Sequence, residues 1–258
     1  MKPIVAEFAM PDVNLRHLAN IFADLDDSIQ GRLGELRRER QLPFHKSLAS
    51  VLEAFAKRGS GPAYRDFQRK WLVPRALSED GQALKFLDAP FWIEGKLRTA
   101  WRLGLHCSAP IAILDIGMGC GHFSTVGEFF GHRAMGLDLP AETSPLNEYY
   151  ADYRRVMRLN WRPQTIRAMK PLEFPHHGER YDLVVGLLTN FNCDPLKGPW
   201  EPQEWEFFLD DIGRNFVRPG GRIFLQLTRL LTGSLSWAYL KGRSSWSLDL
   251  AMQALIKF

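Results

Sequence analysis

The chain has 258 residues, of which 45% are hydrophobic and 24% charged, with a formal net charge of +4. These values are typical of a globular protein and exclude a largely disordered, fibrous or collagen-like chain. No run of about 18 apolar residues occurs, so we expect no membrane-spanning helix. An acid, Glu7, stands where a signal peptide would have its apolar stretch. The three cysteines (Cys107, Cys120, Cys193) lack disulfide or zinc spacing, so we predict a reduced, cytoplasmic protein without a metal site.

Residues 1–108 show the periodicity of amphipathic helices. Breakers such as Pro43 and the run 59–62 separate the helices, and a last one is predicted from about Asp88 to Trp101. We therefore predict a helical N-terminal extension over 1–108. The apolar stripes that support it are Leu15, Leu18, Phe22, Leu25 and Ile29, then Leu48, Val51, Leu52 and Phe55, then Tyr64, Phe67 and Trp71.

The excess positive charge lies within this extension. Residues 31–75 contain eleven Lys/Arg and four Asp/Glu, a net charge of +7, whereas residues 76–258 contain twenty of each. Such a segment can attract RNA or another polyanion. The alternative is a set of helices with solvated basic faces, favoured by aromatic residues at helical rather than surface-stacking spacing.

From residue 109 onward, short apolar runs alternate with helix-sized segments. Strands are predicted over 111–116, 133–138, 165–168, 182–188 and 222–227, with helices over 145–159 and 201–216 and a turn at 219–221. Strands alternating with helices favour right-handed crossovers and a parallel sheet covered on both faces. Residues 109–258 are therefore predicted to form a doubly wound, mostly parallel, Rossmann-like α/β domain.

Three glycines, Gly117, Gly119 and Gly121, follow the first predicted strand and precede a helix. Glycines at this point let a backbone bend closely around a ligand at the carboxyl end of a strand. The dinucleotide pattern G-x-G-x-x-G/A is absent because His122 holds its sixth position, and no Lys-Ser or Lys-Thr follows as in a phosphate loop. Asp115 would repel a pyrophosphate but suits an ammonium group. The loop therefore predicts a nucleoside with a cationic tail.

A second acid, Asp138, ends the second predicted strand, 21 residues after Gly117. An acid at about this spacing accepts hydrogen bonds from the two hydroxyls of a ribose. Such charge-assisted bonds contribute about 1.5–3 kcal/mol each. Asp138 is therefore predicted to bind the ribose.

Together, the segments 115–121, Asp138, 181–185 and 218–222 resemble the class I, Rossmann-like S-adenosylmethionine-dependent methyltransferases. The resemblance covers roughly 111–227 and implies that S-adenosylmethionine is the cofactor. It also implies that the glycine loop and Asp115 lie at the methionine moiety, Asp138 at the ribose and Leu139 near the adenine. The cofactor contacts expected on this basis are Asp115, Gly117, Met118, Gly119, Gly121, Asp138, Leu139, Met169 and Thr189.

The sequence departs from the family pattern in two places. The stretch 168–170, after the third predicted strand, has no acid for the adenine amino group, so backbone groups would have to bind it. The usual final antiparallel strands are not evident, since only 254–258 looks strand-like after the fifth strand. We therefore expect a sheet shortened to six strands, or a lid or partner-binding element at 234–243.

The acceptor side is predicted to be the loop 189–195. It lacks the Asn/Asp-Pro-Pro-aromatic motif of many amino-group methyltransferases. Phe191 and Trp200 either line the methyl site, where an aromatic face favours a cation, or pack in the core. Candidates for orienting or deprotonating an acceptor are His122, Asn190 and Asp194, although Asp194 also suits a turn before a proline.

These features predict a methyltransferase that acts on a small-molecule acceptor, with the N-terminal helices as part of the acceptor pocket. A second interpretation gives the enzyme an RNA or protein substrate recruited by the basic 31–75 segment. A third is an inactive module that has the fold but no cofactor affinity, and a fourth is a nicotinamide-dependent dehydrogenase. No membrane partner is expected, and the sequence makes no prediction of the oligomeric state.

Overall fold

The computed structural model describes residues 25–38, 42–59, 61–76, 86–173, 179–189, 191, 193–194, 198–227, 246–249 and 254–257. The chain forms two compact units, residues 1–92 and 93–258. The predicted domain boundary at residue 108 stays a prediction.

The described part of the first unit consists mainly of helices, α2 (Leu25–Arg38), α3 (Pro43–Gly59) and α4 (Pro62–Ala76). The two apolar stripes predicted for the second and third helices are confirmed. Their buried members are Leu48, Val51, Leu52 and Phe55 of α3, and Tyr64, Phe67 and Trp71 of α4. Of the first predicted stripe, Ile29 is buried in α2, while residues 15–24 lie outside the described part of the chain.

Helix α5 (Ala89–Arg102) begins where the sequence predicts it. Asp88 precedes the helix, and its Oδ1 accepts a hydrogen bond from the Phe91 backbone N–H at 3.3 Å. Pro90 stands in the first turn, where a missing N–H costs nothing. The division between the two units falls within this helix, between Trp92 and Ile93.

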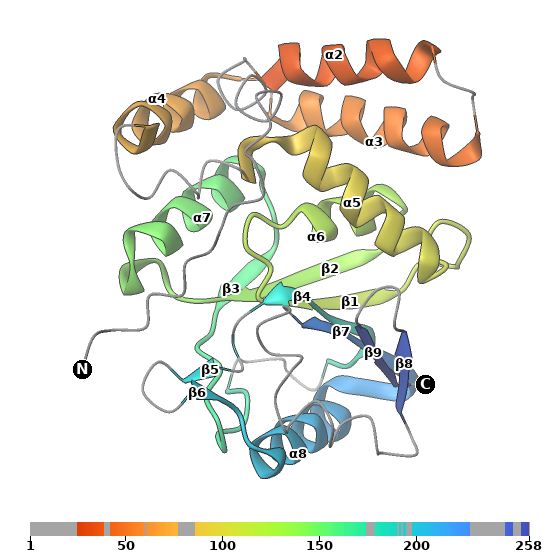
Figure 1. Ribbon diagram of the computed structural model, residues 1–258, viewed down its shortest axis with the longest axis vertical. Coiled ribbons are helices and arrows are strands. Elements are labelled where there is room, and N and C mark those ends of the chain that lie inside the picture. Colours follow the sequence, from red (N-terminus) through yellow and green to blue (C-terminus); the bar gives the residue numbers. More distant parts are fainter. Residues whose placement is uncertain are drawn as a thin grey trace. The chain divides into compact units, whose positions relative to one another are not determined.

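The second unit is built on a seven-stranded sheet of order β3-β2-β1-β4-β7-β9-β8 (Figure 1). Its strands are β1 (Ala112–Ile116), β2 (Arg133–Asp138), β3 (Trp161–Pro163), β4 (Tyr181–Thr189), β7 (Val217–Leu227), β8 (Trp246–Asp249) and β9 (Ala254–Lys257). A separate antiparallel pair is formed by β5 (Cys193–Asp194) and β6 (Gly198–Pro199). The helices are α6 (His122–Phe129), α7 (Pro145–Val156), preceded by the short helix Ala141–Thr143, and α8 (Pro202–Asp211), continued by a π-turn over Ile212–Phe216.

Helices cover both faces of this sheet, with α6 and α7 on one side and α8 on the other (Figure 1). The doubly wound α/β fold is therefore confirmed. In β1, side chains alternate between the faces, because successive residues of a strand point in opposite directions. Leu114 and Ile116 belong to the core cluster that contains Trp205 of α8, whereas Asp115 contacts Ser124 of α6.

The predicted third strand was wrong by about four residues. The strand next to β2 is Trp161–Pro163, which pairs in parallel with Gly136 to Asp138, while residues 165–168 form no strand. The Gly136 N–H donates to Asn160 O at 2.9 Å, and the Gln164 N–H donates to Asp138 O at 2.7 Å. Pro163 concealed the strand in the sequence, but an edge strand tolerates proline because one side of it needs no partner.

The expectation of a shortened, six-stranded sheet was also wrong. Strand β9 pairs antiparallel with β7, and β8 pairs antiparallel with β9. The segment 234–243, predicted as a possible lid, lies outside the described residues. The turn predicted at 219–221 lies inside β7, as an irregular stretch between the pairs Tyr181↔Val217 and Leu183↔Arg222.

Among the residues that the structure describes, none of the helices has the length and apolar character needed to cross a membrane.

Candidate functional site

The glycine loop joins the carboxyl end of β1 to α6 and is held against β2. The backbone N–H groups of Gly117 and Met118 both donate to the Leu137 carbonyl, at 2.8 and 3.2 Å. Gly117, Gly119 and Gly121 all have positive φ, at 66°, 55° and 75°. Residues other than glycine pay about 1–2 kcal/mol in this conformation, so the bend depends on all three glycines.

The space around the three glycines differs. A Cβ on Gly117 would lie 2.3 Å from Thr189 Oγ1 at the end of β4, and one on Gly121 would lie 2.4 Å from Leu159 Cδ1. A Cβ on Gly119 would meet nothing within 4 Å. Packing inside the protein therefore requires two of the glycines to lack a side chain, while the third leaves a free approach to the backbone.

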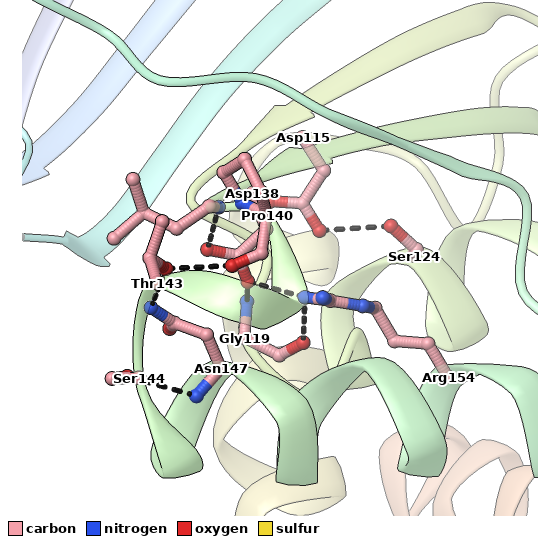
Figure 2. A network of polar contacts seen from close by, with 10 residues as sticks. Asp115, Gly119, Ser124, Asp138, Pro140, Thr143, Ser144, Asn147 and Arg154 are labelled. Atoms are coloured by element: carbon pink, nitrogen blue, oxygen red, sulfur yellow. Dashed lines mark hydrogen bonds and ion pairs between the residues drawn. The ribbon is translucent and has the colours of Figure 1, made fainter.

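Asp138 lies at the end of β2, directly against this open glycine (Figure 2). Its Oδ2 accepts from the Gly119 N–H at 2.9 Å, and its Oδ1 accepts from the Leu139 N–H at 2.8 Å. The Arg154 guanidinium forms an ion pair with the same Oδ2. A carboxylate has about four lone-pair positions, so three are used within the protein. One hydroxyl can bind without displacing a partner, whereas a bidentate diol requires one of these bonds to be given up.

Arg154 comes from α7 and is fully buried. Its Nη1 donates to the Gly119 carbonyl at 2.9 Å as well as to Asp138. The guanidinium carbon lies 3.9 Å from the centroid of the Trp161 ring, and Nε and Nη2 have no hydrogen-bond partner in the described part of the chain. Sequence reasoning missed this residue. The available signal was its position in α7, seven residues after Asn147 and three after Ala151, both buried on the same helix.

Asp115 is placed under the loop and is only 2% exposed. Its Oδ2 accepts from the Ser124 hydroxyl at 2.8 Å (Figure 2). Burial raises the pKa of Asp115 to about 6, although the Ser124 hydrogen bond and the Lys96 ammonium lower it. Burial has the opposite effect on Lys96 of α5, because it disfavours the ammonium and lowers the pKa to about 8. Sequence reasoning did not identify Ser124 or Lys96.

The remaining predicted cofactor contacts differ in accessibility. Leu139 and Met169 are exposed, by 39% and 53%, and Met169 has a positive φ of 56°. Thr189 lies beside Gly117. The Met118 side chain is buried and packs against Gly136, where an added Cβ would lie 1.9 Å from the Met118 sulfur. Little of the Met118 side chain is therefore accessible to a ligand.

His122 is buried at the start of α6, where its Nε2 lies 3.3 Å from the Tyr153 hydroxyl. Burial lowers its pKa to about 3, so the ring stays neutral and is a poor proton acceptor at neutral pH. Of the other two catalytic candidates, Asn190 lies outside the described residues, and only the backbone of Asp194, in β5, is described.

The aromatic residues predicted near the acceptor pack together. The ring centroids of Phe191 and Trp200 are 5.6 Å apart, and those of Trp200 and Trp205 are 5.4 Å apart. Trp200 is 3% exposed and belongs to the core beside α8. The geometry therefore favours the packing interpretation for Trp200.

Two of the segments that carried the family resemblance hold strands together. Asp182 of β4 accepts from the Ala112 N–H of β1 at 2.7 Å, and it pairs with Arg218 of β7 at 2.9 and 3.0 Å. These contacts join the amino ends of three parallel strands, opposite the glycine loop. They stabilise the sheet and do not reach the candidate site.

The sheet order decides the fold. The first five strands, β3, β2, β1, β4 and β7, are parallel, and the antiparallel β9 lies between β7 and β8. The glycine loop follows the central strand β1, and the acid of β2 touches it. The second unit has a doubly wound, Rossmann-like α/β fold.

No protein-family model and no curated protein matches the chain. Among solved structures, the chain is similar to the glycopeptide N-methyltransferase MtfA in complex with S-adenosyl-L-methionine, at 16% identity, over 52% of this chain and 53% of that chain, with a TM-score of 0.35. It is also similar to CalS10, an amino pentose methyltransferase from Micromonospora echinaspora, at 22% identity, over 53% and 51% of the chains, with a TM-score of 0.39. A third is the ribosomal protein L11 methylase from Lactobacillus delbrueckii subsp. bulgaricus, at 16% identity, over 60% and 73%, with a TM-score of 0.36.

The chain spans about half the length of the first of these methyltransferases. Because the identities and TM-scores are low, the function of this chain is inferred from its own residues. In the described part of the chain, no group of three or more His, Cys, Asp or Glu side chains could hold a metal ion.

Proposed function

We propose that the chain belongs to the class I methyltransferase family, binds S-adenosylmethionine in the glycine loop after β1, and transfers its methyl group to a small-molecule acceptor. The observation that carries this proposal is the pairing of Gly119 with Asp138. Gly119 has open space where a Cβ would stand, and its N–H donates to the carboxylate at the end of β2. An open backbone beside an acid suits a nucleoside with a free ribose.

The residues of the loop fit an adenosyl sulfonium better than a dinucleotide. Asp115 places a carboxyl group under the bend, which disfavours a pyrophosphate and favours a cation, whereas the charge of Asp138 is paired with Arg154. Asp138 retains capacity for a ribose hydroxyl, and Leu139, which follows it, offers an exposed apolar side chain to an adenine. Thr189 fills the space beside Gly117 and so closes the far side of the bend.

When bound, the sulfonium supplies an electrophilic methyl group. The protein then has to hold the ligand, align an acceptor and exclude water. Alignment alone lowers such barriers by roughly 7–11 kcal/mol in favourable intramolecular reactions. His122 is buried and binds a proton weakly, so we do not assign it as a general base. The chemistry therefore suits an acceptor that is nucleophilic without a strong base.

The small-molecule acceptor is favoured over RNA by the burial of the aromatic residues in the basic helices. Tyr64, Phe67 and Trp71 of α4 are 3%, 4% and 8% exposed. Proteins that bind single-stranded RNA offer exposed aromatic faces for base stacking, in addition to positive charge. The basic segment 31–75 remains the one feature in favour of an RNA or protein acceptor.

Calorimetric titration with S-adenosylmethionine and S-adenosylhomocysteine tests the proposal. We expect saturable binding of both compounds at one site, and no binding of NAD or NADP. Heat released by the nicotinamide cofactors alone would indicate a dehydrogenase. An absence of both heat and thermal stabilisation at millimolar adenosyl ligand would overturn the proposal in favour of an inactive module.

A further inference from the structure

Both backbone polar groups of Gly119 are tied to one buried ion pair. The Gly119 N–H donates to Asp138 Oδ2, Arg154 Nη1 donates to the Gly119 carbonyl at 2.9 Å, and Arg154 Nη1 also pairs with Asp138 Oδ2 (Figure 2). These contacts form a closed ring that joins α7, the end of β2 and the glycine loop. The glycine with the open Cβ direction is the one that this ring fixes.

Stability alone does not explain this arginine. Its side chain is fully buried, and its Nε and Nη2 have no hydrogen-bond partner among the described residues. Unsatisfied buried donors of this kind destabilise the folded state, and buried ion pairs are often no more stable than an apolar replacement. The Trp161 ring, 3.9 Å from the guanidinium carbon, offsets part of this cost. The arrangement therefore points to a role for the charge itself.

We infer that Arg154 is a positioning residue for nucleoside binding, which holds Asp138 as an ionised acceptor against Gly119 and so presents both to the ribose. This inference rests on the proposed function. Asp138 is itself largely buried, with 12% of its side chain exposed. Burial raises the pKa of Asp138, and the Arg154 charge lowers it. Without Arg154, the carboxyl would take up a proton at a higher pH and lose the charge with which it accepts hydroxyl hydrogen bonds.

Other groups around the pair also titrate, so the test has to isolate Arg154. Asp115 of β1 and Cys120 of the loop interact electrostatically with Asp138, and Tyr150 of α7 interacts with Arg154. Lys96 acts on Asp115 in turn. A comparison of variant with wild type at each pH cancels these contributions, because the surrounding groups are common to both proteins.

The experiment measures S-adenosylhomocysteine affinity of wild type and Arg154→Met by calorimetry between pH 6 and 8. We expect the variant to bind at least about 10-fold more weakly at neutral pH. We further expect the affinity of the variant, divided by that of wild type at the same pH, to fall by up to about 10-fold for each pH unit below the raised pKa of Asp138. Arg154→Lys, which keeps a positive charge, should restore the pH profile. Arg155→Met, which removes the exposed neighbour paired with Asp152, should match wild type.

A loss of affinity by the same factor at every pH would overturn the inference, since it would assign Arg154 a purely structural role. Unchanged or tighter binding would overturn it as well. If Arg154→Met does not fold, Asp138→Asn is compared with the double variant Asp138→Asn/Arg154→Met. Because Arg154 is inferred to act through the Asp138 charge, the second substitution should then change affinity by less than about 2-fold. Additive losses would contradict the inference.

A measurement without ligand separates this inference from the proposed function. The ¹³C carboxyl resonance of Asp138 reports its ionisation in the unliganded protein. We expect Asp138 to protonate at a higher pH in Arg154→Met than in wild type. If wild type binds no adenosyl ligand, the proposed function fails, whereas an unshifted Asp138 titration would show that Arg154 does not control its charge.

Discussion

Asp138 occupies a position where the proposed ribose contact and the stability of the fold depend on the same carboxylate. It accepts hydrogen bonds from two backbone N–H groups, those of Gly119 and Leu139, and it neutralises Arg154. The proposed ribose contact adds a further demand on the same two oxygens. A substitution at this position is therefore expected to affect both the folded state and ligand affinity, and the two effects need separate measurements.

We predict that Asp138→Asn weakens S-adenosylhomocysteine binding by at least about 10-fold, because a charge-assisted hydrogen bond is lost. Asp138→Ala should also lower the free energy of unfolding by about 3–5 kcal/mol, because it leaves Arg154 buried without a counter-charge. Calorimetry and urea denaturation measure the two effects. Asp210→Asn, which removes an acid from the exposed pair with Arg214, serves as the control. Wild-type affinity in Asp138→Asn would show that the ribose binds elsewhere.

Asp115 gives a prediction about pH. Its folded pKa of about 6 lies above the ordinary value of 3.8, so the folded state binds its proton more tightly than the unfolded state. As the pH rises from about 4 to 6, the ionisation of Asp115 therefore becomes a cost to the folded state and lowers the free energy of unfolding, by up to about 3 kcal/mol in total. Asp115→Asn keeps an acceptor for Ser124 and removes this cost.

Urea denaturation at several pH values between 4 and 8 checks this expectation. The free energy of unfolding of Asp115→Asn minus that of wild type should grow between pH 4 and 6 and remain constant above pH 6. A constant difference over the whole range would mean that Asp115 stays ionised in the folded protein despite its burial.

At the scale of single elements, the bend between β1 and α6 is the proposed ligand-binding element. Its three glycines share a left-handed backbone but differ in surroundings. Thr189 of β4 closes on Gly117, and Leu159 closes on Gly121, whereas Gly119 is open. Alanine substitutions at these three positions therefore distinguish the effects of backbone strain, of steric clash and of a blocked approach for the ligand.

We predict that Gly119→Ala lowers the free energy of unfolding by only about 1–2 kcal/mol, because of its backbone conformation, yet largely abolishes S-adenosylhomocysteine binding. Gly117→Ala should be more destabilising, since its Cβ would also lie 2.3 Å from Thr189 Oγ1. Gly104→Ala is the matched control, because Gly104 has a φ of +75° and open surroundings. Thermal unfolding and calorimetry distinguish the three variants. Retained binding in Gly119→Ala, or in the bulkier Gly119→Val, would contradict a close approach of the ligand at this glycine.

At the scale of the whole molecule, the charge distribution raises the question of an RNA acceptor. The net charge of +7 over residues 31–75 is carried by the helical first unit, and residues such as Arg37, Lys46 and Arg65 are exposed there. The aromatic side chains Phe55 of α3 and Tyr64, Phe67 and Trp71 of α4 are buried. We therefore expect these charges to be a solvated surface.

The corresponding prediction concerns salt. RNA affinity, measured by fluorescence anisotropy, should be weak, and the triple variant Arg37→Gln/Lys46→Gln/Arg65→Gln should not change it at any salt concentration. A true RNA-binding surface would lose affinity steeply as salt increases, and the triple variant would reduce that slope. That outcome would favour the RNA-acceptor alternative.

Local patterns in the sequence determined the elements that depend on neighbouring residues. The apolar stripes predicted α3 and α4, Pro90 in a first turn predicted a helix start near Asp88, and the glycine run predicted the bend after β1. Periodicity and turn chemistry act within a few residues, so they can be recognised without the fold. The position of Asp138 at the end of β2, beside the loop, also followed from the spacing.

Only the tertiary structure decided which residues meet across the sheet. Strand β3 was identified by its pairing with β2, because Trp161–Pro163 has no strand pattern of its own. Strand β8 became evident only through its pairing with β9, whose strand-like pattern the sequence already showed. The ion pair of Arg154 with Asp138 joins residues of a helix and a strand, and the burial that raises the pKa of Asp115 arises from the whole core. Each of these depends on long-range packing, which brings together groups that the sequence keeps apart.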